Sequence, residues 1–112
     1  MDFKVLCVGD VVGNPGMERI RRSLRYLKRK HNADFVIVNG ENAAVVGMTP
    51  QQGEDILDSG AACITMGNHT WGKRDIVTYL VDCPQIIRPA NYAPQVPGRG
   101  WAEFETTAEP LR

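Results

Sequence analysis

Three short apolar runs, each closed by a glycine and a polar side chain, constrain the fold of this chain more than any other feature. The runs are FKVLCV at residues 3–8, FVIV at 35–38 and AACITM at 61–66. Each is apolar almost without interruption, which is typical of strands buried on both faces of a parallel sheet. Segments with helical periodicity separate the runs, so the predicted order of elements is βαβαβα. This order predicts an α/β fold, a parallel sheet with flanking helices and right-handed crossovers.

The first predicted helix covers residues 17–31. Its apolar side chains are spaced by three, four and three residues, which places them on one face of a helix. They are Met17, Ile20, Leu24 and Leu27. Just upstream, Asn14 is suited to capping the helix and Pro15 to its first position.

Two further helices are predicted. The sequence TPQQ at 49–52 reads as a capping box with proline in the first turn, and Gly60 is suited to end the helix that follows. The third helix is expected over residues 73–81, with Ile76, Val77 and Leu80 buried.

The last part of the chain has a different composition, because five of the seven prolines follow residue 83. This predicts a meandering loop with two short strands, at residues 86–87 and 101–105. We interpret residues 1–112 as a single domain.

Charge and cysteine content exclude several classes of protein. The 13 Lys+Arg and 13 Asp+Glu residues give zero net charge, which excludes a generally basic nucleic-acid binder. No apolar run has the length of a membrane span, and the first residues lack the apolar segment of a signal peptide. The three cysteines form no CxxC pair, which favours a reducing, cytoplasmic location. Cys7 and Cys63 are expected to be core thiols.

Seven of the 13 basic residues are concentrated in the first predicted helix, between Arg19 and Lys30. A basic helix can contact RNA. With an apolar face opposite, such a helix is more often a solvated surface, and nucleic acid is not an expected partner.

The residues suited to chemistry directly follow the three predicted strands. They are Asp10 after the first strand, Glu41 and Asn42 after the second, and Asn68 and His69 after the third. Ligands bind beyond the carboxyl ends of the strands in an open parallel sheet, so these side chains are expected in one crevice. Carboxylate, carboxamide and imidazole groups suit divalent ions such as manganese, iron, magnesium or zinc. One such ending is commonly only a turn, but three on consecutive strands favour a functional site.

A dinucleotide-binding site is the main alternative for these strand ends. It requires G-x-G-x-x-G after the first strand, whereas the glycines here are Gly9, Gly13 and Gly16. Asp10 would also place a negative charge where the pyrophosphate lies, although Glu41 is placed roughly as a ribose-binding acid would be. The glycine spacing therefore argues against this alternative.

Four segments together resemble the YmdB-like branch of the calcineurin-like metallophosphoesterases. They are GDVVGNPG (9–16), NGENAA (39–44), TMGNHTW (65–71) and RPANY (88–92). The resemblance covers nearly the whole chain, in order and at matching separations. It implies half of the metallophosphoesterase αββα sandwich. It also implies a phosphodiesterase that uses two divalent metal ions and acts on cyclic nucleotides, including the 2′,3′-cyclic type.

The same resemblance implies a role for each of the five strand-end residues. Asp10 would ligate the first metal, Glu41 would bridge both, and Asn42 and Asn68 would ligate the second. His69 would donate a proton to the leaving oxygen. These roles agree with elementary chemistry, since two neighbouring cations need a bridging carboxylate and a general acid accelerates a reaction by about 10²–10⁴-fold.

Other residues near these motifs have less specific interpretations. Arg88 and Asn91 are weak candidates for substrate binding, or they only order the proline-rich loop. Trp71 either stacks on a base or covers the edge of the core.

Members of this family are considerably longer, and the resemblance places their remaining metal ligands on histidines of a second half. This chain has only His31 and His69, and His31 is expected to be a solvated residue at a helix end. We therefore expect an N-terminal half with an exposed apolar sheet face, which associates with a complementary half or with a second copy. By itself the piece is expected to be inactive. The alternative is a non-catalytic metal- or nucleotide-binding module.

Overall fold

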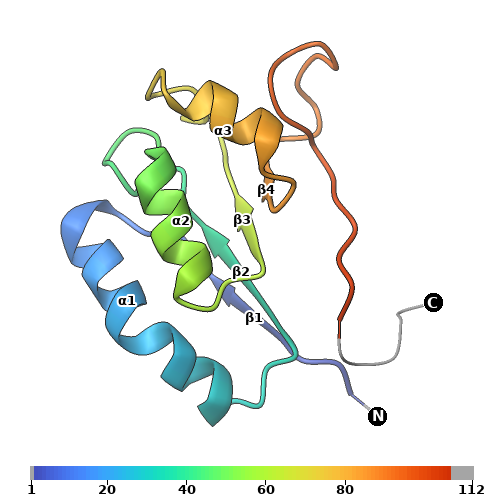
Figure 1. Cartoon of the computed structure of the whole chain (residues 1–112). Helices are drawn as coiled ribbons and strands as arrows, with labels where there is room; N and C mark the ends of the chain where they lie inside the picture. Colours follow the sequence, from blue (N-terminus) through green and yellow to red (C-terminus); the bar gives the residue numbers. More distant parts are fainter. Residues whose placement is uncertain (1, 107–112) are drawn as a thin grey trace.

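The structure is a computed structural model that describes residues 2–106. Within these residues strands and helices alternate (Figure 1), in the order β1 (Val5–Val8), α1 (Gly13–Lys30), β2 (Phe35–Asn39), α2 (Pro50–Asp58), β3 (Cys63–Thr65), α3 (Ile76–Asp82) and β4 (Ile86–Ile87). The strands pair in the order β1-β2-β3-β4, and every pair is parallel. The predicted α/β fold with a parallel sheet is therefore confirmed. None of the helices in the described part of the chain is long and apolar enough to span a membrane.

The strand order explains why the helices pack on one face of the sheet. Right-handed crossovers that all advance in the same direction leave the connecting helices on the same side. In Figure 1, α1 and α2 lie next to each other over the sheet. The register aligns the side chains of this face in rows, with Val38 between Val8 and Ile64. The helices bury six large apolar side chains against them: Met17, Ile20, Leu24, Ile56, Ile76 and Leu80.

The opposite face of the sheet, which we call the outer face, is only partly covered. Burial alternates along β1 and β2, and Val5 is 45% exposed. The sequence predicts burial on both faces, and this is wrong for these two strands because the helices cover only one face. Phe104, from the segment after β4, contacts Phe35 on the outer face with the ring centroids 5.2 Å apart.

The two cysteines expected in the core differ in their burial. Cys63 is buried on β3, and its burial raises the pKa of its thiol. Cys7 is exposed on the outer face of β1, so its assignment to the core is wrong. Membership of a strand does not determine which face of the sheet a residue occupies, and the sequence offers no other signal for Cys7.

The first two helices differ in how well their starts are predicted. The capping box of α2 is confirmed, because the Thr49 hydroxyl accepts from the Gln52 backbone and the Gln52 side chain accepts from the Thr49 backbone. In α1 the helix begins at Gly13, and Val12 precedes it in an extended conformation without a side-chain cap. Asn14 therefore lies inside the helix, and its predicted capping role is wrong.

The third helix and the last segment are shorter or less regular than predicted. α3 begins at Ile76, after a turn over residues 73–75, and Val77 is 36% exposed rather than buried. The short strand β4 is confirmed as the edge of the sheet. The predicted strand at residues 101–105 is absent, and Trp101 is 71% exposed. The backbone meets the end of β4 just before this segment, where Arg88 N donates to Arg99 O at 2.9 Å, but residues 101–105 do not continue the pairing as a strand.

Candidate functional site

The carboxyl ends of β1, β2 and β3 bring several of the predicted residues together. Asp10 follows β1, Glu41 and Asn42 follow β2, and Asn68 and His69 follow β3. Because the strands are parallel and adjacent, all of these positions lie at one edge of the sheet.

A hydrogen-bonded chain joins one residue from each of these three strand ends. Asn42 Nδ2 donates to Asp10 Oδ1 at 2.8 Å, and Asn42 Oδ1 lies 2.6 Å from His69 Nδ1. Since Oδ1 can only accept, His69 Nδ1 carries the shared proton. The other ring nitrogen, Nε2, is thereby left to face a ligand, on a side chain that is 38% exposed. We call these three residues the Asp10–Asn42–His69 chain.

Glu41 lies beside this chain. Its Oε2 accepts a hydrogen bond from the His69 backbone at 3.3 Å and lies 4.0 Å from His69 Nδ1. The carboxylate also covers Gly67 so closely that a Cβ at position 67 would collide with it. Glycine at position 67 is therefore required for the approach of Glu41 to the β3 end.

The backbone around the Asp10–Asn42–His69 chain is both anchored and strained. Asn42 O accepts from Gly13 N at 3.1 Å and from Val45 N at 2.8 Å, which ties the β2 end to the start of α1. Asp10 and Val45 have positive φ angles of 42° and 70°. This conformation is unfavourable for side chains other than glycine, above all for a β-branched one, and such strain is common at functional sites.

Asn68 is placed at the same edge but is less engaged. It is exposed, and within residues 2–106 it makes no hydrogen bond to the other four predicted residues. The structure therefore brings Asp10, Glu41, Asn42 and His69 into contact and leaves Asn68 next to them.

An aromatic pair that the sequence analysis did not foresee supports the β3 end. The rings of Trp71 and Tyr92 lie 5.1 Å apart, and the Tyr92 hydroxyl donates to Gly67 O at 3.4 Å. Trp71 Nε1 is buried without a hydrogen-bond partner among the described residues. The sequence RPANY contained the tyrosine, but nothing in its spacing indicated a contact with residues 67–71.

The two weak candidates for substrate binding occupy different environments. Arg88 is only 6% exposed, and its Nη1 donates to Pro89 O at 2.9 Å. Asn91 is exposed in the loop that follows. Within the described part of the chain neither is hydrogen-bonded to the residues of the Asp10–Asn42–His69 chain.

The donor set at the strand ends is the feature most relevant to metal binding. Two carboxylates, two carboxamides and an imidazole fit hard or borderline divalent ions. Among the described residues no three His, Cys, Asp or Glu side chains form a group that could hold a metal ion. A site here would therefore depend on amide oxygens, and Asn42 Oδ1 has a second lone pair for this purpose.

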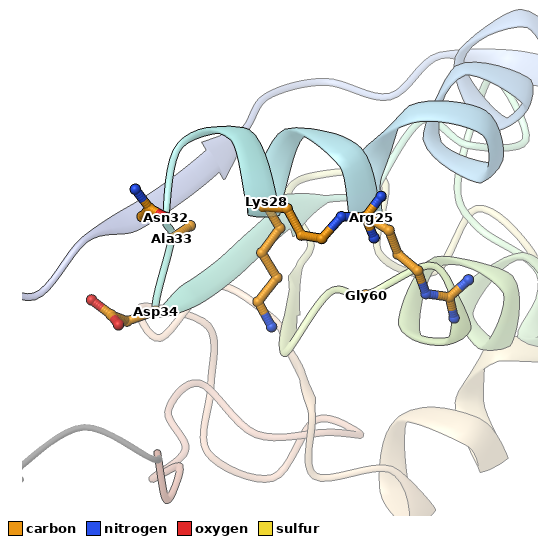
Figure 2. A pocket seen from close by; sticks show the side chains of 7 residues that line it. Arg25, Lys28, Asn32, Ala33, Asp34 and Gly60 are labelled. Carbon is orange, nitrogen blue, oxygen red and sulfur yellow. The ribbon is translucent and has the colours of Figure 1, made fainter.

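A pocket of about 540 Å³ lies at the opposite edge of the sheet (Figure 2). It is lined by the last turns of α1, by residues 32–34 before β2 and by Gly60 before β3. Arg25, Lys28 and Arg29 contribute its positive charge. None of the five predicted strand-end residues lines this pocket.

Comparison with known proteins identifies the family. The sequence profile of the YmdB-like proteins matches residues 6–111. This chain belongs to the YmdB-like protein family. A relative from Bacillus subtilis (strain 168), named 2′,3′-cyclic-nucleotide 2′-phosphodiesterase, is 44% identical over 99 residues. That alignment covers 88% of this chain and 38% of the relative.

Solved structures agree with the family and with the fold. A hypothetical protein from Thermus thermophilus matches with a TM-score of 0.80 at 31% identity, over 90% of this chain and 39% of that one. A novel phosphatase from Mycoplasma pneumoniae matches with a TM-score of 0.77 at 35% identity, over 88% and 37%. The chain thus spans about two fifths of the length of these proteins, and its sheet is the predicted half of a metallophosphoesterase fold.

Proposed function

We propose that this chain forms part of a phosphodiesterase site that uses two divalent metal ions and acts on 2′,3′-cyclic nucleotides. The observation on which the proposal rests is the Asp10–Asn42–His69 chain beside Glu41, at the edge where parallel sheets bind ligands. The name of the Bacillus subtilis relative supplies the substrate class.

In this proposal the metal ligands are residues of all three strand ends. Asp10 would hold the first ion, Glu41 would bridge both ions, and Asn42 and Asn68 would hold the second. Iron or manganese would suit these oxygen donors together with the histidines expected from a complementary half, with magnesium or zinc as the other choices. When bound, the ions supply an activated water and offset the charge that develops on the phosphate.

His69 is proposed as the proton donor to the leaving oxygen. The hydrogen bond to Asn42 fixes Nδ1, so the imidazolium presents its second proton on Nε2. Asn42 also connects His69 to the Asp10 carboxylate, which restrains the orientation of the ring. A proton delivered to the leaving group contributes about 10²–10⁴-fold to the rate.

The whole activity requires more protein than this chain contains. We propose that the remaining metal ligands come from a complementary half, or from a second copy of the chain. The outer face of the sheet, with Val5 and Cys7 exposed, is the surface that such a partner would cover.

A second candidate function is a non-catalytic metal- or nucleotide-binding module. It is favoured by the lack, within residues 2–106, of three His, Cys, Asp or Glu side chains in a metal-binding group. Such a module would bind one ion or nucleotide at the same strand ends but would catalyse no hydrolysis.

Metal analysis and a hydrolysis assay test the proposal together. After dialysis against Mn²⁺, the chain alone is expected to retain at most one weakly held ion and to show no appreciable turnover of 2′,3′-cyclic AMP. Asp10→Ala and Glu41→Gln should abolish this binding, whereas Asp2→Asn, at an exposed position outside the site, should not.

Addition of the remaining part of the Bacillus subtilis relative, as a separate polypeptide, should restore two ions and hydrolysis. An assembly that holds two ions but hydrolyses nothing would support the binding module instead. Two tightly held ions and full activity from the chain alone would show that the proposed ligand count is wrong.

A further inference from the structure

A row of polar side chains runs along the solvent face of α1. It consists of Arg19, Arg22, Tyr26 and Arg29, which are spaced by three, four and three residues. The apolar residues from Met17 to Leu27 have the same spacing, two positions earlier. Because two residues turn a helix by about 200°, the row points away from the core. All four members are exposed, and we call them the α1 stripe.

The arginines of the α1 stripe lack acidic partners within residues 2–106. Two other arginines of α1 are engaged with α2, since Arg21 pairs with Asp55 at 2.8 Å and Arg25 donates to the Asp58 backbone carbonyl. No such ion pair is formed by the stripe arginines in the described part of the chain. Their charges are therefore available to a ligand.

The stability of the helix does not explain these charges. Cations in the last turn, such as Arg29, offset the negative end of the helix dipole. Arg19 and Arg22 lie in the first half of the helix, where a cation gains nothing from the dipole. Arg22 and Arg29 also lie three and four residues from Arg25, and like charges at these spacings destabilise a helix. Glu18, four residues before Arg22, offsets only part of this repulsion. A polyanion on the solvent face would offset this repulsion.

Tyr26 gives the stripe a second property. Tyr26 is 55% exposed between the arginines, and Lys30 Nζ lies 5.9 Å from the centroid of its ring. An exposed aromatic ring among cations is the combination on which unpaired bases stack while their phosphates contact the cations. A duplex, whose bases are already stacked, cannot use the ring in this way.

The stripe also extends from the candidate site at one edge of the sheet to the basic pocket at the opposite edge. The start of α1 is hydrogen-bonded to Asn42 of the candidate site through Gly13 N at 3.1 Å. Its other end reaches the basic pocket of Figure 2, which Arg29 also lines. An 18-residue helix is about 27 Å long, enough to follow several nucleotides of a single strand.

We propose that the α1 stripe binds single-stranded RNA along its sugar–phosphate backbone, with one base stacked on Tyr26. The charge pattern of the sequence alone favours a solvated surface for this helix, whereas the arginines, without ion pairs in the part of the chain that the structure describes, and the exposed tyrosine between them favour RNA. If the proposed function holds, α1 would direct an RNA end toward the strand-end site, and this part of the inference rests on the proposed function. The binding itself needs neither metal nor hydrolysis.

Fluorescence anisotropy with a labelled 12-nucleotide oligo(A) RNA, measured in EDTA over a range of salt concentrations, tests the proposal. Three phosphate contacts predict a slope of log K against log salt of about −2, at about −0.7 per contact in a single strand. Arg22→Glu with Arg29→Glu should weaken binding about tenfold or more at low salt and flatten the slope. Tyr26→Ala should weaken binding at least about fivefold, and Tyr26→Phe should leave it unchanged.

The matched control is the double variant Lys73→Glu with Arg74→Glu, which reverses the charge of two other exposed residues in the turn before α3. In Figure 1, α2 lies between α3 and α1. This control changes the net charge by the same amount and should leave RNA binding within about twofold of the original. Circular dichroism and thermal unfolding of every variant confirm that α1 is intact.

Three results would overturn the proposal. These are an equal loss in the control double variant, equal affinity for duplex DNA with no effect of Tyr26→Ala, and stronger binding to vesicles of anionic lipid than to RNA. The test also separates this inference from the proposed function. RNA binding that persists in Asp10→Ala would support the stripe whatever the outcome for the proposed function. A complemented assembly that hydrolyses nothing but still binds RNA would count only against the phosphodiesterase.

Discussion

His69 Nδ1 and Asn42 Oδ1 lie 2.6 Å apart, and this contact leaves Nε2 as the ring nitrogen that can face a ligand. The Asn42 amide cannot rotate by 180° without losing the 2.8 Å hydrogen bond from its Nδ2 to Asp10 Oδ1. The carboxylate of one strand end thus fixes the amide of the second, and the amide fixes the ring of the third.

The first prediction concerns the tautomer of His69. In its neutral form His69 should carry its proton on Nδ1, whereas an unrestrained histidine favours Nε2. Nitrogen-15 chemical shifts of the two imidazoles report this directly, and the exposed His31 is the internal control. Asn42→Ala should return His69 to the pattern of His31. Identical shifts for both rings in the unchanged protein would contradict the hydrogen-bond assignment.

The second prediction uses two glycines at strand ends. Gly67→Ala should displace Glu41, because the new methyl group would occupy the position of the carboxylate. We expect Mn²⁺ affinity to fall about 10- to 100-fold. The free energy of unfolding should fall by less than about 1 kcal/mol, because only the flexible end of Glu41 has to move.

Gly9→Ala is the matched control, since a Cβ at this position meets no atom within 4 Å. Its free energy of unfolding should remain within about 0.5 kcal/mol of the original. Calorimetric titration and urea unfolding measure the two quantities. Unchanged metal affinity in Gly67→Ala would mean that Glu41 is not a ligand.

The third prediction concerns pH and the contact between α1 and α2. The hydrogen bond from Arg21 and a second one from Gln51 lower the pKa of Asp55 below its usual value. The folded state therefore gains stability from the ionised carboxylate above the unfolded pKa, about 3.9, and loses it as the pH falls through the lower folded value.

Asp55→Asn should accordingly reduce the free energy of unfolding by about 0.2–1 kcal/mol at pH 7, the range of an exposed ion pair. The difference should shrink as the pH falls below about 4. Urea unfolding at several pH values measures it, and Asp58→Asn, with an exposed side chain on the same helix, is the comparison. A difference that stays constant down to the most acid pH would assign the loss to packing.

The fourth prediction tests the proton donor in an assembly that has phosphodiesterase activity. His69→Ala should reduce kcat strongly for 2′,3′-cyclic AMP, whose alkoxide leaving group needs a proton, by about 10²–10⁴-fold. It should affect bis(p-nitrophenyl) phosphate much less, since nitrophenolate leaves without protonation. An equal loss on both substrates, or a loss of bound metal, would make His69 a ligand or a structural residue.

Local sequence patterns predicted most of the fold and the order of the strand-end residues. The alternation of apolar runs and helical periodicity indicated the parallel sheet, and the Thr49–Gln52 capping box indicated the start of α2. These features depend on neighbouring residues alone. The start of α1 was missed because the backbone of Gly13 bonds to Asn42, which lies on another strand end.

Tertiary contacts explain the remaining differences. An apolar run such as that of β1 looks the same whether one face or both faces will be covered, so the exposure of Cys7 could not be foreseen. The contact of Trp71 with Tyr92 and the approach of Glu41 to Gly67 join segments about 20 to 30 residues apart. The periodicity of a sequence does not indicate such contacts. For the approach of Glu41, the one available signal was the glycine before Asn68.

The strand order β1-β2-β3-β4 also has a consequence for folding. Each new strand is added beside the one that preceded it in the chain, so every pairing closes a loop of similar and moderate length. All three members of the Asp10–Asn42–His69 chain are present once residue 69 has been synthesised. This part of the site can therefore form from the first three strands, before β4 is added at the edge of the sheet.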